Sequence, residues 1–181
     1  MDVFMEYLIN RKKDAKDIII ISGIVLAALL LTIILLLALL MFAQVPMVGS
    51  IGMLLVVGIW WGAYQLMSRR NIEWEYILTN SEFDIDKIMS KKGRKRVLSI
   101  DFKDANLVAR VDDTAHNYEF SGNKTSKNIK VMDFTGGKNV GETYFIDIMI
   151  ENERKYVLFQ PTSKMIEAIR KFNPRNVFII E

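Results

Sequence analysis

Cysteine is absent from this 181-residue chain, and histidine occurs once, as His116. Without cysteine the chain has no disulfide, no thiolate zinc site and no thiol nucleophile. A single histidine also excludes metal sites that use several histidines and relays between two of them. Charge is missing from one long stretch, because residues 18–68 contain no Asp, Glu, Lys, Arg or His. Catalysis by a thiol nucleophile and metal sites built from thiolates or several histidines are therefore excluded.

The uncharged stretch is long enough to cross a membrane twice. A bilayer core about 30 Å thick needs roughly 20 apolar residues in one helix. Gln44 and Pro46 interrupt the stretch, and proline ends a helix because it lacks an N–H and clashes with the preceding turn. We therefore expect two transmembrane helices, over 18–42 and 47–67, joined by a tight turn.

Basic residues flank this hairpin, whereas the turn inside it has none. Lys and Arg are retained on the cytoplasmic side during membrane insertion. The pattern predicts a multi-pass protein of the cell membrane with both termini in the cytoplasm. The residues that would set this topology are Arg11, Lys12, Lys13, Lys16, Arg69 and Arg70.

Small residues in the apolar segments indicate where helices approach one another closely. Gly58 and Gly62 form a GxxxG pair, and Gly23 with Ala27 forms a similar pair. Small side chains allow helix backbones to pack tightly within a membrane. Two interpretations remain open: the two spans pack on each other, which we favour, or copies of the chain pack together.

Residues 1–17 form a cytoplasmic amphipathic segment. Val3, Phe4, Tyr7 and Leu8 lie at helical spacing, with polar residues between them. Such a helix either lies flat among the lipid headgroups or packs on the rest of the protein.

After residue 71 the apolar period changes from that of a helix to that of a strand, as Ile72, Trp74 and Tyr76 show. Seven short strands are expected, followed by an amphipathic helix that Thr162 or Ser163 caps. Residues 71–181 would then form one mainly β domain, an antiparallel barrel or sandwich closed by the C-terminal helix. The strands are expected near 72–78, 83–88, 97–100, 107–111, 128–134, 142–150 and 155–160, and the apolar stripe of the helix comprises Met165, Ile166, Ile169 and Phe172.

Several segments resemble known bacterial membrane proteins. The opening MDVFMEYLINRKKDAKD, the segment EYILTNSEFDIDKIMSKKGRKRVLSIDF and the closing helix resemble a family of small two-span proteins from clostridia-type Firmicutes. The segment WEYILTNSEFDI resembles the start of the pleckstrin-homology-like (PH-like) domain that follows two spans in bacterial proteins. The resemblance implies a membrane location and a PH-like fold, and it brings no established activity or catalytic residues.

The charge distribution argues against a nucleic-acid partner. The chain carries a formal charge of +3, but from residue 71 onward 18 Lys and Arg are balanced by 17 Asp and Glu. A nucleic-acid-binding domain would need a basic face of its own. One local cluster stands out, in a loop expected between the second and third strands: Lys91, Lys92, Arg94, Lys95 and Arg96.

This basic loop has two interpretations. It is either a solvated hairpin loop that discourages edge-to-edge pairing of sheets, or a surface that contacts anionic lipid. An up-and-down order of strands would return the loop to the inner membrane surface, where each basic residue contributes about 1 kcal/mol within a Debye length of roughly 8 Å. Both interpretations remain open.

No set of residues predicts an enzyme. His116 lies among acidic residues and could bind a metal or act as a base, but a lone histidine in a polar loop is more often simply exposed. Asp84 and Asp86 share one strand face, where paired carboxylates usually serve solubility. Gly136-Gly137 lacks the Gly-Lys-Ser/Thr context of a phosphate loop.

We therefore expect a membrane-anchored, non-catalytic interaction or scaffold domain with no cofactor, no metal and no small-molecule substrate. Its partners would be membrane lipid and a protein, either another protein or further copies of the chain. The alternative function is a sensor of anionic inner-leaflet lipid that acts through residues 91–96.

Overall fold

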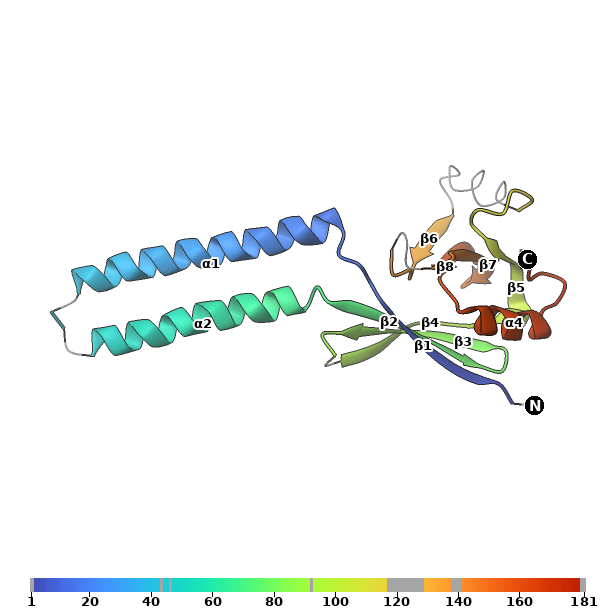
Figure 1. Ribbon diagram of the computed structural model, residues 1–181, viewed down its shortest axis with the longest axis horizontal. Helices are drawn as coiled ribbons and strands as arrows, with labels where there is room; N and C mark the ends of the chain where they lie inside the picture. Colours follow the sequence, from blue (N-terminus) through green and yellow to red (C-terminus); the bar gives the residue numbers. More distant parts are fainter. Residues whose placement is uncertain are drawn as a thin grey trace. The chain divides into compact units, whose positions relative to one another are not determined.

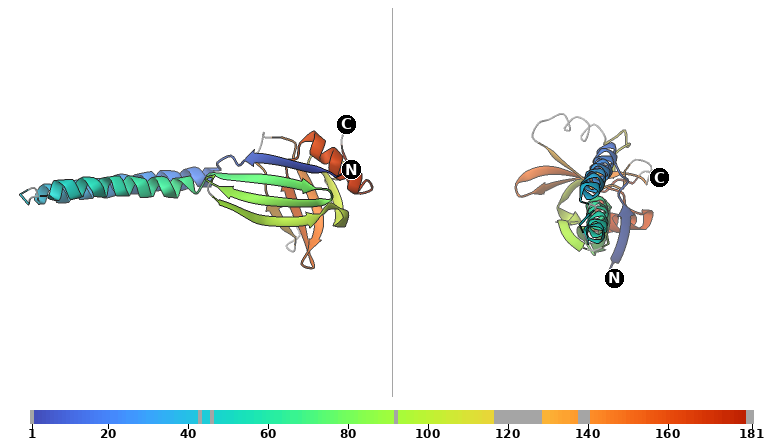
Figure 2. Two further views of the ribbon diagram at one scale, coloured as in Figure 1. Left: turned by 90° about the horizontal axis from the view of Figure 1, so that it is seen from below. Right: turned by 90° about the vertical axis from the view of Figure 1, so that its left-hand side faces the viewer.

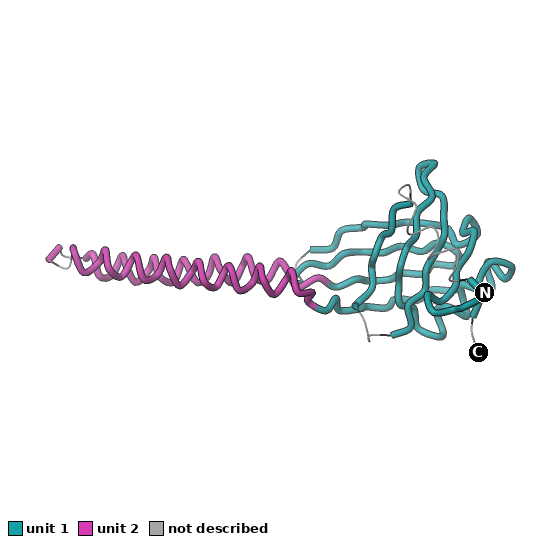
Figure 3. Tube along the Cα trace, turned by 90° about the horizontal axis from the view of Figure 1, so that it is seen from above, with its two compact units in different colours: residues 1–12, 73–181 teal, residues 13–72 magenta. Residues whose placement is uncertain are grey.

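The computed structural model describes residues 2–42, 44–45, 47–91, 93–116, 129–137 and 141–179. These residues form two long helices, eight β-strands in two sheets, one short 3₁₀ helix and a C-terminal helix (Figure 1). The chain divides into two compact units, residues 13–72 and residues 1–12 together with 73–181 (Figure 3).

The helical unit consists of α1 (Ala15–Met41) and α2 (Val48–Ser68). α1 begins at a capping box, in which the Asp14 side chain accepts a bond from the first turn and Asp17 accepts one from the Asp14 N–H. Most of the large apolar side chains of both helices are exposed. Both helices are long and apolar enough to cross a membrane, judged by length and composition.

The two helices meet through small residues other than the expected pair. Gly52 and Ala63 of α2 are buried, and a Cβ placed on Gly52 would lie only 2.3 Å from Cδ1 of Leu39 on α1. A Cβ placed on Gly58 or Gly62 would meet nothing within 4 Å in the described part of the chain. Gly58 and Gly62 therefore make no close contact with α1 within the described residues, and a role of this pair in helix packing stays a prediction.

The first sheet, called sheet 1, contains four strands that run side by side in the order β1-β2-β3-β4 (Figure 2, left). These are β1 (Phe4–Asn10), β2 (Ile72–Thr79), β3 (Glu82–Met89) and β4 (Gly93–Asp101). β1 pairs antiparallel with β2, from Phe4 opposite Thr79 to Asn10 opposite Glu73. β4 is longer than predicted, since its ladder with β3 extends to Met89 opposite Gly93.

The helix that the spacing within residues 1–17 predicts is wrong, because residues 4–10 form the strand β1. Its side chains alternate between more and less exposed positions, and Ile9 is buried. A strand at this place obtains its backbone hydrogen bonds from β2, a partner more than 60 residues away that local spacing does not reveal. The β domain thus includes an N-terminal strand that a boundary at residue 71 leaves out.

The second sheet, sheet 2, has the order β5-β7-β8-β6. Its strands are β5 (Ala105–Arg110), β6 (Lys130–Asp133), β7 (Tyr144–Ile150) and β8 (Glu153–Phe159). β6 runs parallel to β8, so the sheet is not wholly antiparallel. The prediction of seven strands in a closed barrel is wrong, because the described residues form eight strands in two separate sheets. The alternative of two sheets agrees with this arrangement, in which the 3₁₀ helix η1 (Phe102–Asp104) joins one sheet to the other.

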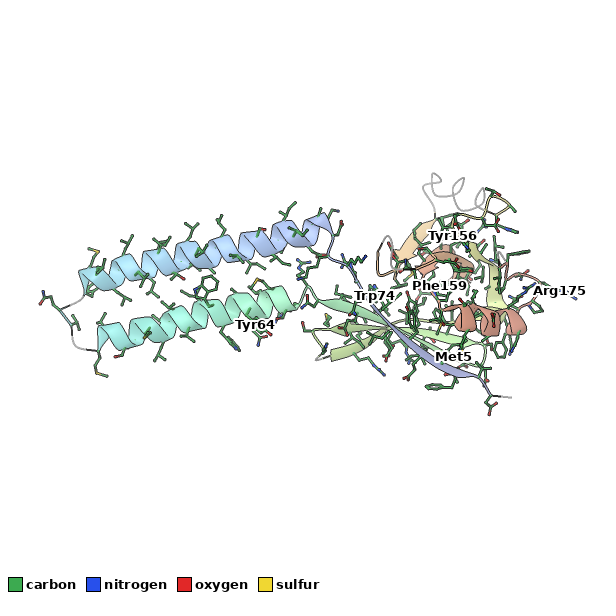
Figure 4. All side chains as sticks on the ribbon, in the orientation of Figure 1. Met5, Tyr64, Trp74, Tyr156, Phe159 and Arg175 are labelled. Atoms are coloured by element: carbon green, nitrogen blue, oxygen red, sulfur yellow. The ribbon has the colours of Figure 1, made fainter. Side chains whose placement is uncertain are left out.

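An aromatic core fills the space between the two sheets. Phe159 on β8 lies within 6.3 Å, centroid to centroid, of four other rings, which come from both sheets and from η1. Its side chain is fully buried, and Figure 4 shows it within the β domain. The neighbouring rings belong to Tyr76, Phe83, Phe102 and Tyr144.

The C-terminal helix α4 (Ser163–Phe172) agrees with the predicted position, and Thr162 caps it by accepting a bond from the Met165 N–H. Its buried residues are Met165, Ile166, Ala168 and Ile169. Phe172, which the predicted stripe includes, is only half-buried. After the helix, Asn173 donates to the carbonyls of Phe102 and Ala105, which ties the C-terminal segment to the corner between the sheets.

Candidate functional site

The predicted basic cluster lies at one end of sheet 1, where β3 joins β4. Arg94, Lys95 and Arg96 are exposed residues of β4 itself and not of a loop. Lys91 lies in the connecting turn with φ 58°, after Ser90 with φ 53°. Lys92 lies outside the described residues.

The two arginines of the cluster are engaged with carboxylates. Arg94 pairs with Glu75 of β2, and its Nε lies 3.8 Å from Oδ2 of Asp86 on β3. Arg96 reaches Oδ2 of Asp84 through Nη1 at 2.8 Å and Oδ1 of Asp86 through Nε at 3.1 Å. Glu75 and Asp86 are themselves buried. Three strands thus contribute to one network in which carboxylates neutralise both arginines.

Strand alternation brings this network together. Asp84 and Asp86 are two residues apart, as are Arg94 and Arg96, so each pair projects from one face of the sheet. The hydrogen bond to Asp86 raises the pKa of Arg96, which keeps that guanidinium charged. The paired aspartates that resemble an acid–base pair in the sequence therefore serve as partners for arginine.

The lysines are arranged differently. Lys95 lies directly opposite Lys87 of β3, and both project from the face opposite to the arginines because they alternate with them along the strands. No ion pair involves Lys87, Lys91 or Lys95 among the described residues. We call these three residues the lysine surface. Sequence reasoning missed Lys87, although counting back across the turn from Lys95 would have found it.

β1 supplies a second exposed feature at the edge of sheet 1. The side chains of Phe4 and Leu8 project from the same face and are 65% and 45% exposed. β1 pairs with β2 on one side only in the described part of the chain. An edge strand with exposed apolar side chains can accept a further strand or an apolar surface.

His116 is held in place by two contacts. Its Nδ1 lies 2.7 Å from Oδ2 of Asp113, and its ring stacks on Phe178 with centroids 4.0 Å apart. The contact with His116 lowers the pKa of Asp113. Nearby, Arg110 bridges Asp112 and Glu142. The arrangement connects the end of β5 to the C-terminal segment.

The pair of His116 and Asp113 is not part of a larger set of acidic and histidine side chains in the described part of the chain. Within the described residues there is no group of three or more His, Cys, Asp or Glu side chains that could hold a metal ion. A cleft of about 600 Å³ lies at the N-terminus of α4 and carries two carboxylates, Glu142 and Glu167, beside Tyr144. Burial raises the pKa of Tyr144, so its hydroxyl stays neutral.

The residues predicted to set membrane topology fall in both units. Arg70 lies 3.6 Å from Asp17, so the residues that follow α2 are linked to the first turn of α1. The backbone N–H of Lys12 donates to the carbonyl of Gly136 at 2.8 Å within the β domain. Lys13, Lys16 and Arg69 are exposed, and Arg11 is half-buried.

Comparison with known proteins places the chain in a family. The family model described as a bacterial PH-like domain (DUF6106) matches residues 1–179, which includes both helices and the whole β domain. Searches of curated proteins and of solved structures found no match. The chain therefore belongs to the bacterial PH-like domain family DUF6106.

Proposed function

We propose that this protein is a membrane-anchored, non-catalytic interaction module. α1 and α2 cross the cell membrane as a hairpin, with spans near 18–42 and 47–67, and both termini lie in the cytoplasm. The uncharged stretch 18–68, which supplies most of both helices, and the basic residues on both of its flanks support this arrangement. The PH-like domain consists of the residues from 71 onward together with β1, which precedes the hairpin in sequence. In this arrangement the domain presents its surfaces at the inner leaflet.

The observation that carries the proposal is the exposed edge of sheet 1. Phe4 and Leu8 are large apolar side chains on an edge strand, and they are 65% and 45% exposed. Their neighbour Ile77, across the ladder at Glu6, is 9% exposed. This part of sheet 1 therefore combines a backbone edge that has no partner strand among the described residues with an apolar patch. Domains bind an extended peptide or a further strand through this combination.

The proposed partner is a protein, and the binding mode is strand addition at β1. Backbone N–H and C=O groups of the free edge would bond to the added strand, while Phe4 and Leu8 would pack on its side chains. Both another protein and a second copy of this chain meet these requirements. Catalysis forms no part of the proposal.

Photo-crosslinking in the full-length protein tests the proposal directly. A photoreactive residue at position 4 or 8 should yield a discrete crosslinked species in native membranes, whereas one at the exposed Lys164 of α4 should not. Coexpression of two differently tagged copies separates self-association from binding to another protein.

A crosslinked band that carries both tags identifies a second copy, and a band with one tag and a new mass identifies another protein. Either result supports the proposal. Crosslinking at positions 4 and 8 that is no stronger and no more discrete than at position 164 would overturn it.

A further inference from the structure

We propose that the lysine surface, formed by Lys87, Lys91 and Lys95, binds the anionic surface of the bilayer in which the protein is anchored. The inference rests on the proposed membrane anchoring and is independent of any protein partner at β1. It assigns lipid binding to a different set of residues from the whole basic cluster 91–96, because it includes Lys87 and leaves out both arginines.

The first argument is the pairing of like charges. Lys87 and Lys95 occupy directly opposite positions on neighbouring antiparallel strands, where side chains are close together and like charges repel. A pairing of this kind weakens the sheet unless an anion lies between or beside the two ammonium groups. A nearby anionic surface would attract both ammonium groups and so offset their mutual repulsion.

The second argument is that the carboxylates at this end of the sheet are already engaged. Glu75, Asp84 and Asp86 pair with Arg94 and Arg96 on one face. The lysines project from the opposite face or from the turn and have no ion-pair partner among the described residues. The uncompensated positive charge is therefore concentrated on the lysine surface.

The third argument is connectivity. β1 ends at Asn10 opposite Glu73 near the start of β2, and only residues 69–71 separate α2 from β2. β3 runs antiparallel back from the turn at residues 80–81, so it ends, at Met89, at this same end of sheet 1. The lysine surface thus lies at the end of the sheet to which both membrane helices are joined by short linkers.

The expected magnitude follows from the energy of a basic residue near an anionic leaflet. Each lysine contributes about fivefold to the ratio of docked to undocked domain at moderate salt. Three lysines together give roughly a hundredfold. The effect should decline steeply with salt, because the Debye length falls from about 8 Å at 0.15 M to about 3 Å at 1 M.

The test uses the full chain reconstituted into vesicles. Because the chain has no cysteine, Met89→Cys introduces a single labelling site, and Met89 is 39% exposed beside the lysine surface. An environment-sensitive fluorophore at this position reports docking by a blue shift and by protection from an aqueous quencher. The vesicles contain either phosphatidylcholine alone or phosphatidylcholine with phosphatidylglycerol.

We expect the fluorophore to be protected from the quencher only in vesicles that contain phosphatidylglycerol, and we expect this protection to be lost at high salt. It should also be lost in the triple variant Lys87→Gln, Lys91→Gln, Lys95→Gln. A matched triple variant at exposed lysines elsewhere, Lys103→Gln, Lys164→Gln and Lys171→Gln, should retain it. Thermal unfolding of both variants shows that the domain is folded in each.

Three results would overturn the proposal. The first is equal protection of the fluorophore in both kinds of vesicle, and the second is full protection in the Lys87, Lys91 and Lys95 triple variant. The third is protection in phosphatidylcholine vesicles only after polyglutamate is added, because that result would indicate that the lysines bind an acidic protein. Flotation with the vesicles is measured in parallel. Failure to float contradicts the membrane anchoring itself, whereas flotation without lipid-dependent protection contradicts the lysine surface alone.

Discussion

At the scale of single residues, three carboxylates determine what the basic cluster can do. Glu75, Asp84 and Asp86 form ion pairs with Arg94 and Arg96. In the sequence these two exposed arginines could be taken for a binding surface, but their ion pairs connect three strands of sheet 1. Lys87 and Lys95 lie on the other face of the same strands, and no carboxylate of the described residues pairs with them. Because neighbouring residues of a strand project from opposite faces, the arginines form a stabilising ion-pair network on one face and the lysines are available to an external anion on the other.

Arg94→Gln should destabilise the β domain much more than Lys91→Gln. The buried Glu75 carboxylate loses its cationic partner in the first variant, which costs about 1–3 kcal/mol. Lys91 has no ion-pair partner among the residues that the structure describes, so its substitution should change the free energy of unfolding by less than about 0.5 kcal/mol. Denaturant unfolding of the full chain in detergent measures both values. Equal effects would show that the arginine is not structural.

The contact between His116 and Asp113 predicts how the stability of the fold depends on pH in acid. The hydrogen bond with His116 lowers the pKa of Asp113 in the folded state below its ordinary value of 3.8. Asp113 therefore stabilises the fold at pH above 3.8, and this contribution is lost as the pH falls through the lowered value. An NMR titration of the Asp113 carboxyl carbon should show that pKa below 3.8, and His116→Ala should raise it. An unchanged pKa in the variant would contradict the contact.

At the scale of elements, the parts that follow from local pattern were predictable. β2 and the first half of β3 alternate apolar and polar residues, whereas β7 and β8 are mainly apolar runs on either side of a polar turn. α4 has a cap at Thr162 and a stop at Asn173-Pro174. β1 was not predictable in this way, because its apolar residues fit a helical spacing equally well and both long apolar helices separate it in sequence from its partner β2. The parallel pairing of β6 with β8 is likewise a contact distant in sequence.

The role of α4 is tested by two of its apolar residues. Ile169 is fully buried, so Ile169→Ala should destabilise the domain by about 2–5 kcal/mol. Phe172 is half-buried, and Phe172→Ala should destabilise it clearly less. Melting temperatures of the two full-length variants give the order. A larger drop for Phe172→Ala would show that the helix packs through a different face.

The place of β1 in the domain is tested by a soluble fragment. Residues 71–181 alone lack the strand that pairs with β2 and that buries Ile9, so this fragment should aggregate. Joining residues 1–12 to residue 71 through a short Gly-Ser linker, in place of the hairpin, should give a monomer on size-exclusion chromatography. A folded, monomeric 71–181 fragment would show that β1 is dispensable.

At the scale of the whole molecule, the chain combines a helical hairpin with a PH-like domain whose strands come from both sides of that hairpin. The hairpin was predictable because residues 18–68 contain no charge. The internal contact of the hairpin was not predictable, since Gly52 packs on Leu39, whereas a Cβ on the more conspicuous Gly58 or Gly62 would meet nothing within 4 Å in the described part of the chain. Composition is enough to predict an apolar helix, but which of its faces packs on a second helix depends on the side chains of that second helix.

The central claim is that the hairpin crosses the membrane and holds the PH-like domain at its inner surface. Because the chain has no cysteine, Gln44→Cys and Lys171→Cys each create one labelling site, in the turn and on α4. In intact spheroplasts a membrane-impermeant maleimide should label Cys at position 44 and should reach position 171 only after lysis. Labelling at position 171 before lysis, with position 44 protected until then, would contradict the account.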